Sequence, residues 1–250
     1  MAKLSDFRIV LSLAILLILS SIGYPYILPP TQIIEFMAKR FATIKTLKII
    51  QLTKIKDLDQ EEEKVFGEII YLRSPALYRS EIAGQPAKRL IIHKGTKTLK
   101  IIDSMITSEG ESQDPLYRFL MLAQGAKRLL ERLSAVGINL DKASLTRFED
   151  RIAYLIGDKE EGAPKLLVDK DLFLPLLLQY GNVAFHFSDY RELKRQTWYP
   201  YKIAYSFNGA IIEEYNVKDI TVNASIDLSL FDIPLISSQF GKSGLKPEKQ

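Results

Sequence analysis

The chain has 250 residues, of which 47% are hydrophobic and 26% are charged. This length and composition suffice for one sizeable core, and all-β domains commonly reach this size as a single unit. The net charge of +4 is small and spread along the chain. Because clustered basic residues with stacking aromatics are missing, we expect no nucleic-acid partner. The absence of cysteine excludes disulfides, thiolate metal sites, a cysteine nucleophile and an acylated N-terminal cysteine.

An apolar segment at the N-terminus predicts export. Lys3 and Arg8 precede an apolar run over residues 9–22, which is the arrangement of a secretory signal peptide whose cleavage would remove residues 1–23. The alternative is an uncleaved membrane anchor, because the run extended to Leu28 reaches about 20 residues, enough to span a bilayer. Either way we expect the bulk of the chain in the periplasm, anchored to the inner membrane in the second case.

A helix is predicted after this segment. Two prolines end the apolar run, and Thr31 can cap a helix that extends to about Ile44. Its apolar residues form one broad stripe, which indicates a helix packed against a sheet. Strands are expected next at Leu47–Leu58 and Val65–Leu72, separated by a charged hairpin tip.

The stretch GEIIYLRSPALYRSEI, residues 67–82, is the centre of the predicted sheet. Proline cannot donate a ladder hydrogen bond, so we interpret the stretch as two strands joined by a sharp corner at Ser74-Pro75. The next predicted strands, Arg89–His93 and Thr98–Asp103, flank a tight turn that contains glycine, which indicates a hairpin. The polar segment Thr107–Gln113 is predicted to be a loop.

One long helix is predicted in the middle of the chain. Asp114 can cap it, a proline takes its first position, and it extends to about Val136, where Gly137 ends it. Gly125 is expected to weaken or bend its middle.

The remainder of the chain is predicted to be β-structure. Asn208-Gly209 lies between two apolar runs and is the strongest hairpin signal in the sequence. Phe231 and Pro234 are expected to close a domain that spans residues 31–236, and residues 237–250 read as a disordered polar tail. The predicted strands are Leu145–Ile156, Pro164–Val168, Leu172–Gln179, Val183–Tyr190, a strand that opens at Trp198, Ala210–Tyr215 and Val217–Asn223.

No catalytic or metal-binding motif occurs in the sequence. The two histidines, His93 and His186, are far apart and lack a neighbouring ligand pattern, so each is better explained as a strand residue. The adjacent acids at 149–150 and 213–214 fall within predicted strands, where they would point to opposite faces. We therefore expect no enzyme, no metal and no cofactor.

Several segments together resemble the LolA/LolB superfamily of outer-membrane lipoprotein-sorting proteins. The resemblance covers about residues 31–234 and starts from an export signal, a first helix, the strand pair GEIIYLRSPALYR and a lysine-glycine hairpin. It continues through LTRFEDRIAYLIG, LLVDKDLFLPLLL, DYRELKRQTWYP and the closing LFDIP. The resemblance implies a mainly β (α+β) fold, namely a strongly curved, incomplete antiparallel β-barrel whose concave face is covered by helices.

The resemblance also implies a hydrophobic cavity that takes up lipid acyl chains. In the family, an arginine beside the proline-containing strand end helps to hold the lid shut. Arg73 matches that position best, although Ser74 is inserted between arginine and proline here. The residues expected at the cavity and its rim are Ile70, Leu72, Arg73, Leu77, Leu116, Phe119, Leu120 and Trp198.

Two functions are compatible with this sequence. The first is a monomeric periplasmic carrier whose partners are acylated lipoproteins or lipids, together with sorting components of the inner and outer membranes. The second is a membrane-tethered envelope sensor or interaction module on the same fold. Bound lipid would favour the first, whereas an uncleaved N-terminus and a protein partner would favour the second.

Overall fold

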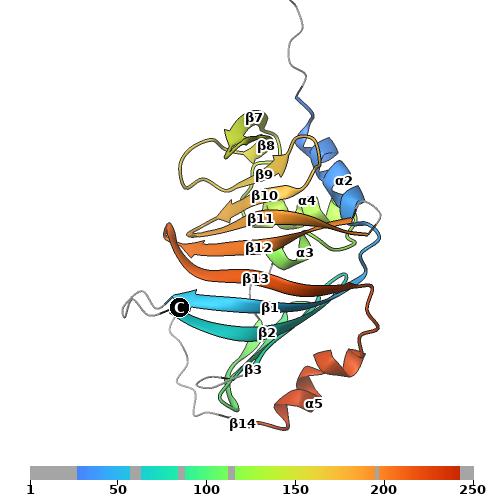
Figure 1. Ribbon diagram of the computed structural model, residues 1–250, viewed down its shortest axis with the longest axis vertical. Helices are drawn as coiled ribbons and strands as arrows, with labels where there is room; N and C mark the ends of the chain where they lie inside the picture. The colour runs from blue at the N-terminus through green and yellow to red at the C-terminus, as the bar shows by residue number, and fades with distance from the viewer. Residues whose placement is uncertain (1–26, 57–62, 84–87, 112–115, 195–196, 243–250) are drawn as a thin grey trace, which may run out of the picture.

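The computed structural model describes residues 27–56, 63–83, 88–111, 116–194 and 197–242. Its strands form one sheet in the order β14-β6-β5-β4-β3-β2-β1-β13-β12-β11-β10-β9-β8-β7 (Figure 1). The strands are β1 (Thr46–Lys56), β2 (Glu63–Arg73), β3 (Leu77–Ala83), β4 (Arg89–Lys94), β5 (Lys97–Ile102), β6 (Met105–Glu111), β7 (Ala143–Phe148), β8 (Arg151–Gly157), β9 (Lys165–Asp169), β10 (Pro175–Tyr180), β11 (Val183–Lys194), β12 (Thr197–Phe207), β13 (Ala210–Val222) and β14 (Gly241–Lys242).

The sheet is curved and open. All neighbouring strands are antiparallel except β14 and β6, which are parallel. The end strands β14 and β7 do not pair with each other in the described part of the chain. The predicted fold class, a mainly β protein with an incomplete antiparallel barrel, is therefore confirmed. β1 pairs with both β2 and β13, so the early and late strands of the chain meet in the middle of the sheet.

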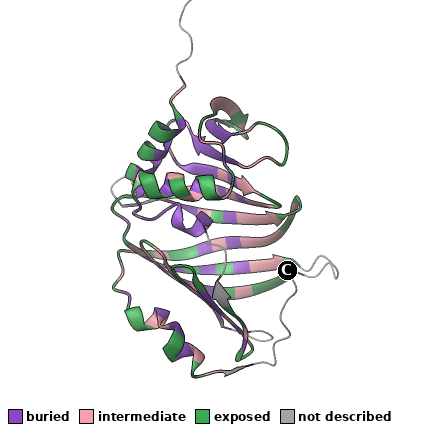
Figure 2. Cartoon of the chain, turned by 180° about the vertical axis from the view of Figure 1, so that it is seen from behind, coloured by how far each residue is buried: buried purple, intermediate pink, exposed green. Residues whose placement is uncertain are grey.

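Three helices cover the concave face: α2 (Pro30–Phe41), α3 (Leu116–Phe119) and α4 (Ala126–Ala135) (Figure 2). α2 has proline at its first position, which is favourable at the start of a helix. Its last turn contains Lys39 and Arg40, and basic residues are favourable at that end. Four residues of its apolar stripe, Ile33, Ile34, Met37 and Phe41, are fully buried in the main core, whereas Phe36 is exposed. The same core contains apolar residues of α3, α4, β1, β2 and β8–β13. The predicted helix at residues 31–44 is thus confirmed.

The single helix predicted over residues 114–136 is wrong, because two short helices occupy this segment. Residues 120–125 between them make tertiary contacts that a continuous helix would forbid. The backbone N–H of Ala123 donates to the carbonyl of Ile44 at 2.7 Å. The side chain of Gln124 donates to the carbonyl of Phe119. Gly125 then adopts an extended conformation at the start of α4, so the glycine breaks the helix rather than bending it.

Two predicted hairpins are confirmed, and four segments differ from prediction. Gly95 and Asn208-Gly209 all have positive φ in their turns, as tight hairpins require. Residues 107–111 of the polar segment predicted as a loop belong to strand β6, because backbone pairing with β5 does not depend on apolar side chains; residues 112–113 lie outside the described residues. The predicted strand 145–156 is the hairpin of β7 and β8, with residues 149–150 in its turn. Residues 172–174 turn before β10, and the two predicted strands after Gly209 form the single strand β13.

The C-terminal segment covers part of the opposite, convex face. There η1 (Leu228–Phe231) and α5 (Ile233–Ser237) pack over β3–β6 and bury Phe231 in a second apolar cluster. The predicted tail therefore starts too early, since β14 pairs with β6 at residues 241–242. Residues 1–23 and 243–250 lie outside the described residues. No helix in the described ranges has the length and apolarity needed to cross a membrane.

Candidate functional site

The space between the concave face and the helices, here called the interior, has an apolar and a polar zone. Strand alternation directs Ile70 and Leu72 of β2 into the apolar zone, where both are fully buried. On the same face of the same strand, Glu68 is 1% exposed and begins the polar zone. The polar zone continues across β1 and β3, with Gln51, Thr53 and Ser80 as further buried members.

Most of the residues expected at a cavity lie in the apolar zone. Leu116, Phe119 and Leu120 come from α3 and the residue that follows it, and each is at most 1% exposed. They belong to the same core cluster as Ile70 and Leu72, and Trp198 packs against that cluster with partial burial. The structure therefore brings six of the eight expected residues together: Ile70, Leu72, Leu116, Phe119, Leu120 and Trp198.

Leu77 and Arg73 do not face the interior. They are paired in register beside the pair Leu72 and Tyr78, so alternation turns them to the opposite face. Leu77 packs against the second apolar cluster on the convex side. Arg73 lines a surface pocket of about 560 Å³ together with Lys45. The prediction that Leu77 lies at the cavity is therefore wrong. Arg73 was expected at the rim of the cavity, but its side chain is on the opposite face of the sheet.

The corner at Ser74-Pro75 contacts the helical cover, defined here as residues 116–135. The hydroxyl of Ser74 donates to the carbonyl of Ala123. From the other side, the guanidinium of Arg132 in α4 donates to the carbonyl of Pro75 at 3.3 Å and to the side-chain oxygen of Gln124 at 2.7 Å. We call the bonds from Ser74 to Ala123 and from Arg132 to Pro75 the cover contacts. The corner and the cover are therefore joined by Ser74 of the corner and Arg132 of the cover, whereas the sequence suggested that Arg73 would make this connection.

Arg118 of α3 is a charged residue inside the interior that the sequence analysis missed. It is 3% exposed, and its guanidinium carbon lies 4.6 Å from the ring centroids of Tyr117 and Tyr215 and 5.5 Å from that of Tyr78. Its Nε and Nη1 atoms have no hydrogen-bond partner in the described part of the chain. The available sequence signal was a lone arginine within the apolar run from Leu116 to Leu122.

The carboxylate of Glu68 organises the polar zone. It accepts hydrogen bonds from the side chains of Gln51 (2.6 Å), Thr53 and Ser80. Arg89 lies 3.8 Å from Glu68 and 3.7 Å from Glu213. A buried carboxylate is tolerated only when its oxygens are satisfied in this way, so the polar zone is a connected network rather than an accident of packing.

Burial shifts the pKa values of several groups that line the interior. Desolvation, with a further contribution from the charge of Arg118, lowers the pKa of His93 to about 4. The ring is therefore neutral at physiological pH, and its Nδ1 lies 2.6 Å from the hydroxyl of Thr98. Burial raises the pKa of Tyr199 to about 12 and raises that of Tyr117 as well, so both phenols stay protonated.

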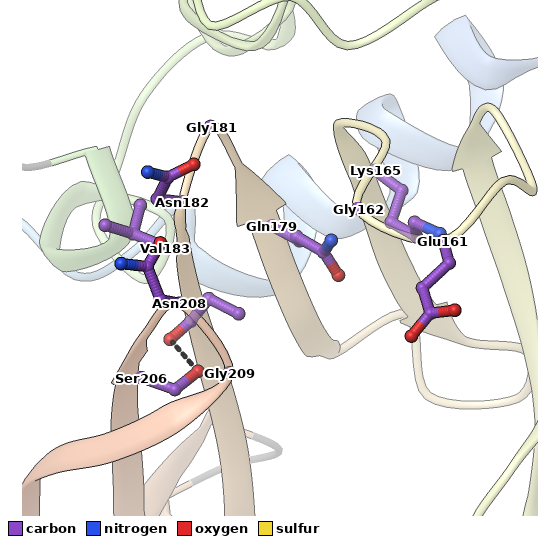
Figure 3. A pocket seen from close by; sticks show the side chains of 11 residues that line it. Glu161, Gly162, Lys165, Gln179, Gly181, Asn182, Val183, Ser206, Asn208 and Gly209 are labelled. Carbon is purple, nitrogen blue, oxygen red and sulfur yellow. Dashed lines mark hydrogen bonds between the residues drawn. The ribbon is translucent and has the colours of Figure 1, made fainter.

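Pockets that are lined by described residues lie at turns and at the ends of strands. The pocket in Figure 3, of about 530 Å³, is lined by polar groups and turn glycines, including Gln179, Asn182 and Asn208. At one side of this pocket, the hydroxyl of Ser206 in β12 donates a hydrogen bond of 3.4 Å to the carbonyl of Ala184 in β11. Such a lining does not suit an apolar ligand. In the interior, by contrast, Phe119, Leu120 and Met121 fill the apolar zone.

The described residues contain no cluster of three or more His, Cys, Asp or Glu side chains that could hold a metal ion. The two histidines are on different strands, with His93 in the interior and His186 beside Glu149 at 3.2 Å. Chemically, the interior offers apolar contact, one unpaired guanidinium and a buried carboxylate network. These are the components of a binding site for an amphipathic molecule.

Solved structures with the same fold support this assignment of the architecture. A domain described as an outer membrane lipoprotein-sorting protein from Vibrio parahaemolyticus aligns with a TM-score of 0.56 and 12% identity over 82% of this chain and 97% of its own. A LolA superfamily protein from Nitrosomonas europaea aligns with a TM-score of 0.55 and 9% identity over 84% and 100%. A DUF1329 family protein from Desulfovibrio piger aligns with a TM-score of 0.55 and 11% identity over 83% and 99%.

No protein-family model and no curated protein matches the sequence. The structural similarities show that the chain has the LolA/LolB-like fold that the sequence predicted.

Proposed function

We propose that this chain, which has a LolA/LolB-like fold, is a carrier that shelters the acyl chains of lipids or lipoproteins. The observation that carries the proposal is the helical cover, two short helices whose apolar side chains fill the concave face of the sheet. An acyl chain in water needs such an apolar environment, at about 0.8 kcal/mol per buried methylene.

The described conformation is interpreted as the closed, unloaded form. Phe119 and Leu120 belong to the same buried cluster as Ile70 and Leu72, and an acyl chain would take their place in it when the helical cover moves outward. The helices that would move with the cover are α3, with four residues, and α4, with ten. The cover contacts tie this segment to the corner at Ser74-Pro75, and we assign them the role of keeping the unloaded form closed.

The proposed setting is the periplasm, where such a carrier would take part in sorting lipoproteins to the outer membrane. The basic and apolar N-terminus supports export. In this proposal residues 31–236 form the carrier domain, the protein acts as a monomer, and inner- and outer-membrane sorting components are its partners. No chemical step is required, since transfer depends on the relative affinity of donor, carrier and acceptor for the acyl chains.

Titration of the purified protein with a fluorescent fatty acid tests the proposal. We expect saturable binding of the probe with a blue-shifted emission, because the fluorophore enters an apolar environment. The same fluorophore without its acyl chain is the control and should not bind. Absence of saturable binding would contradict the carrier function. A crosslinked protein partner in an otherwise lipid-free sample would instead support an interaction module on this fold.

A further inference from the structure

We propose that the guanidinium of Arg118 binds the anionic group of the acyl ligand, a carboxylate or a phosphate. The inference rests on the proposed function, because it assigns the chemical class of ligand to the same interior. It predicts a preference for anionic over neutral amphiphiles that an apolar cavity alone would not provide.

Arg118 forms no ion pair with a carboxylate in the described part of the chain. An arginine stays charged at physiological pH, and burying such a charge is unfavourable unless it is paired and hydrogen-bonded. Arg118 is 3% exposed, and two of its nitrogen atoms lack a hydrogen-bond partner in the ranges that the structure describes. An arginine in this state is suited to receive an anion, because binding would satisfy donors that are already desolvated.

The nearby carboxylates, Glu68 and Glu213, are engaged with other partners. Glu68 accepts hydrogen bonds from three neutral side chains and lies 3.8 Å from Arg89. Glu213 accepts a hydrogen bond of 2.7 Å from the hydroxyl of Tyr215 and lies 3.7 Å from Arg89. Arg89 thus has two acidic neighbours, whereas no ion pair joins Arg118 to any carboxylate in the described part of the chain.

Aromatic rings surround the guanidinium of Arg118. The rings of Tyr78, Tyr117 and Tyr215 contact the guanidinium through cation–π interactions, which partly compensate for the lost water. A guanidinium that packs against aromatic rings keeps its N–H donors in its own plane, where they can form two parallel bonds with a carboxylate or phosphate. The tyrosines therefore hold the charge in place without using its hydrogen-bonding capacity.

The position of Arg118 in the cover also suits a head group. Arg118 lies between Leu116 and Phe119 in α3, beside the apolar zone in which the acyl chain is proposed to lie. Its neighbour Tyr117 stacks on Phe185 with ring centroids 3.9 Å apart. A ligand whose head group reaches Arg118 would therefore place its chain along the apolar residues of the same cover.

Equilibrium dialysis with laurate and dodecanol tests the inference, because these ligands share one chain length and differ in charge. For the full chain we expect laurate to bind about tenfold or more tightly than dodecanol, as a charge-assisted pair implies. Arg118→Gln should reduce this ratio to near one, and Arg118→Lys should give an intermediate ratio because lysine keeps the charge without the planar fork. Dodecyl phosphate should show the same preference as laurate.

Arg79→Gln is the matched control, since Arg79 is on the outward face of β3 and donates to the carbonyl of Leu230 at 2.7 Å. It should keep the wild-type ratio, and circular dichroism of each variant checks its folding. A wild-type ratio near one, or an undiminished ratio in folded Arg118→Gln, would overturn the inference while leaving the carrier function standing. Equal affinity for acetate or inorganic phosphate alone would overturn the assignment to a lipid. If neither laurate nor dodecanol binds, the proposed function fails as well.

Discussion

The hydroxyl of Ser74 donates a hydrogen bond to the carbonyl of Ala123, which lies 49 residues later in the chain. The bond joins the corner between β2 and β3 to the helical cover at the point where the predicted long helix is broken. Arg132 adds a second bond to the same corner through the carbonyl of Pro75. The corner thus has a structural role in positioning the cover as well as in joining two strands.

Removal of the Ser74 hydroxyl should favour opening of the cover. A hydrogen bond of this kind contributes about 1 kcal/mol, so Ser74→Ala should raise the population of the open form about fivefold. The rate at which a fluorescent fatty acid binds, measured by stopped-flow fluorescence, should rise by a similar factor. Ser206→Ala removes a longer bond, of 3.4 Å, from a serine hydroxyl to a backbone carbonyl away from the cover and should leave this rate unchanged. Equal rates for wild type and Ser74→Ala would show that the bond does not limit opening.

Truncation of a cover residue should create space that a ligand can fill. Phe119 and Phe231 are each 1% exposed, but the first lies in the interior and the second in the convex-side cluster. Either change to alanine should lower the free energy of unfolding by about 3 to 5 kcal/mol. Laurate should restore more of the lost melting temperature in Phe119→Ala than in Phe231→Ala. The same restoration in both variants would place the acyl chain outside the interior.

His93 should make the protein less stable in acid. Its folded pKa of about 4 lies below the ordinary value of 6.5, so between these values the unfolded chain binds more protons than the folded one. The free energy of unfolding should therefore fall as the pH drops from about 6.5 to about 4, by at most about 3 kcal/mol for this group. Urea unfolding of wild type and His93→Gln across this range isolates the effect, because other titrating groups are common to both. If the free energy of unfolding depended on pH in the same way in both proteins, the lowered pKa of His93 would be contradicted.

The sheet could be predicted from the sequence because its signals are local. Asn208-Gly209 specifies a hairpin through backbone conformation alone, and apolar runs mark the strands on either side of it. The sequence does not reveal strand β6, because this strand is held by backbone pairing with β5 and its polar residues lack the apolar pattern that marks buried strands.

The candidate site was predicted less well because it depends on tertiary contacts. The break at residues 120–125 follows from the bond between Ala123 and Ile44, which no local pattern announces. Arg73 and Leu77 were assigned to the wrong face because the corner at Ser74-Pro75 sets the phase of both strands. The sequence does mark Arg118 as a single charge within an apolar run. Its three tyrosine neighbours come from separate elements, so their position around the guanidinium could not be predicted from the sequence.

Native mass spectrometry after incubation with a diacylated or triacylated lipopeptide tests the central claim most directly. The account predicts a complex of one protein chain with the lipopeptide, and no complex with the same peptide lacking its acyl chains. A spectrum that contains only the unliganded protein in both samples would contradict the proposal that the interior opens to receive acyl chains.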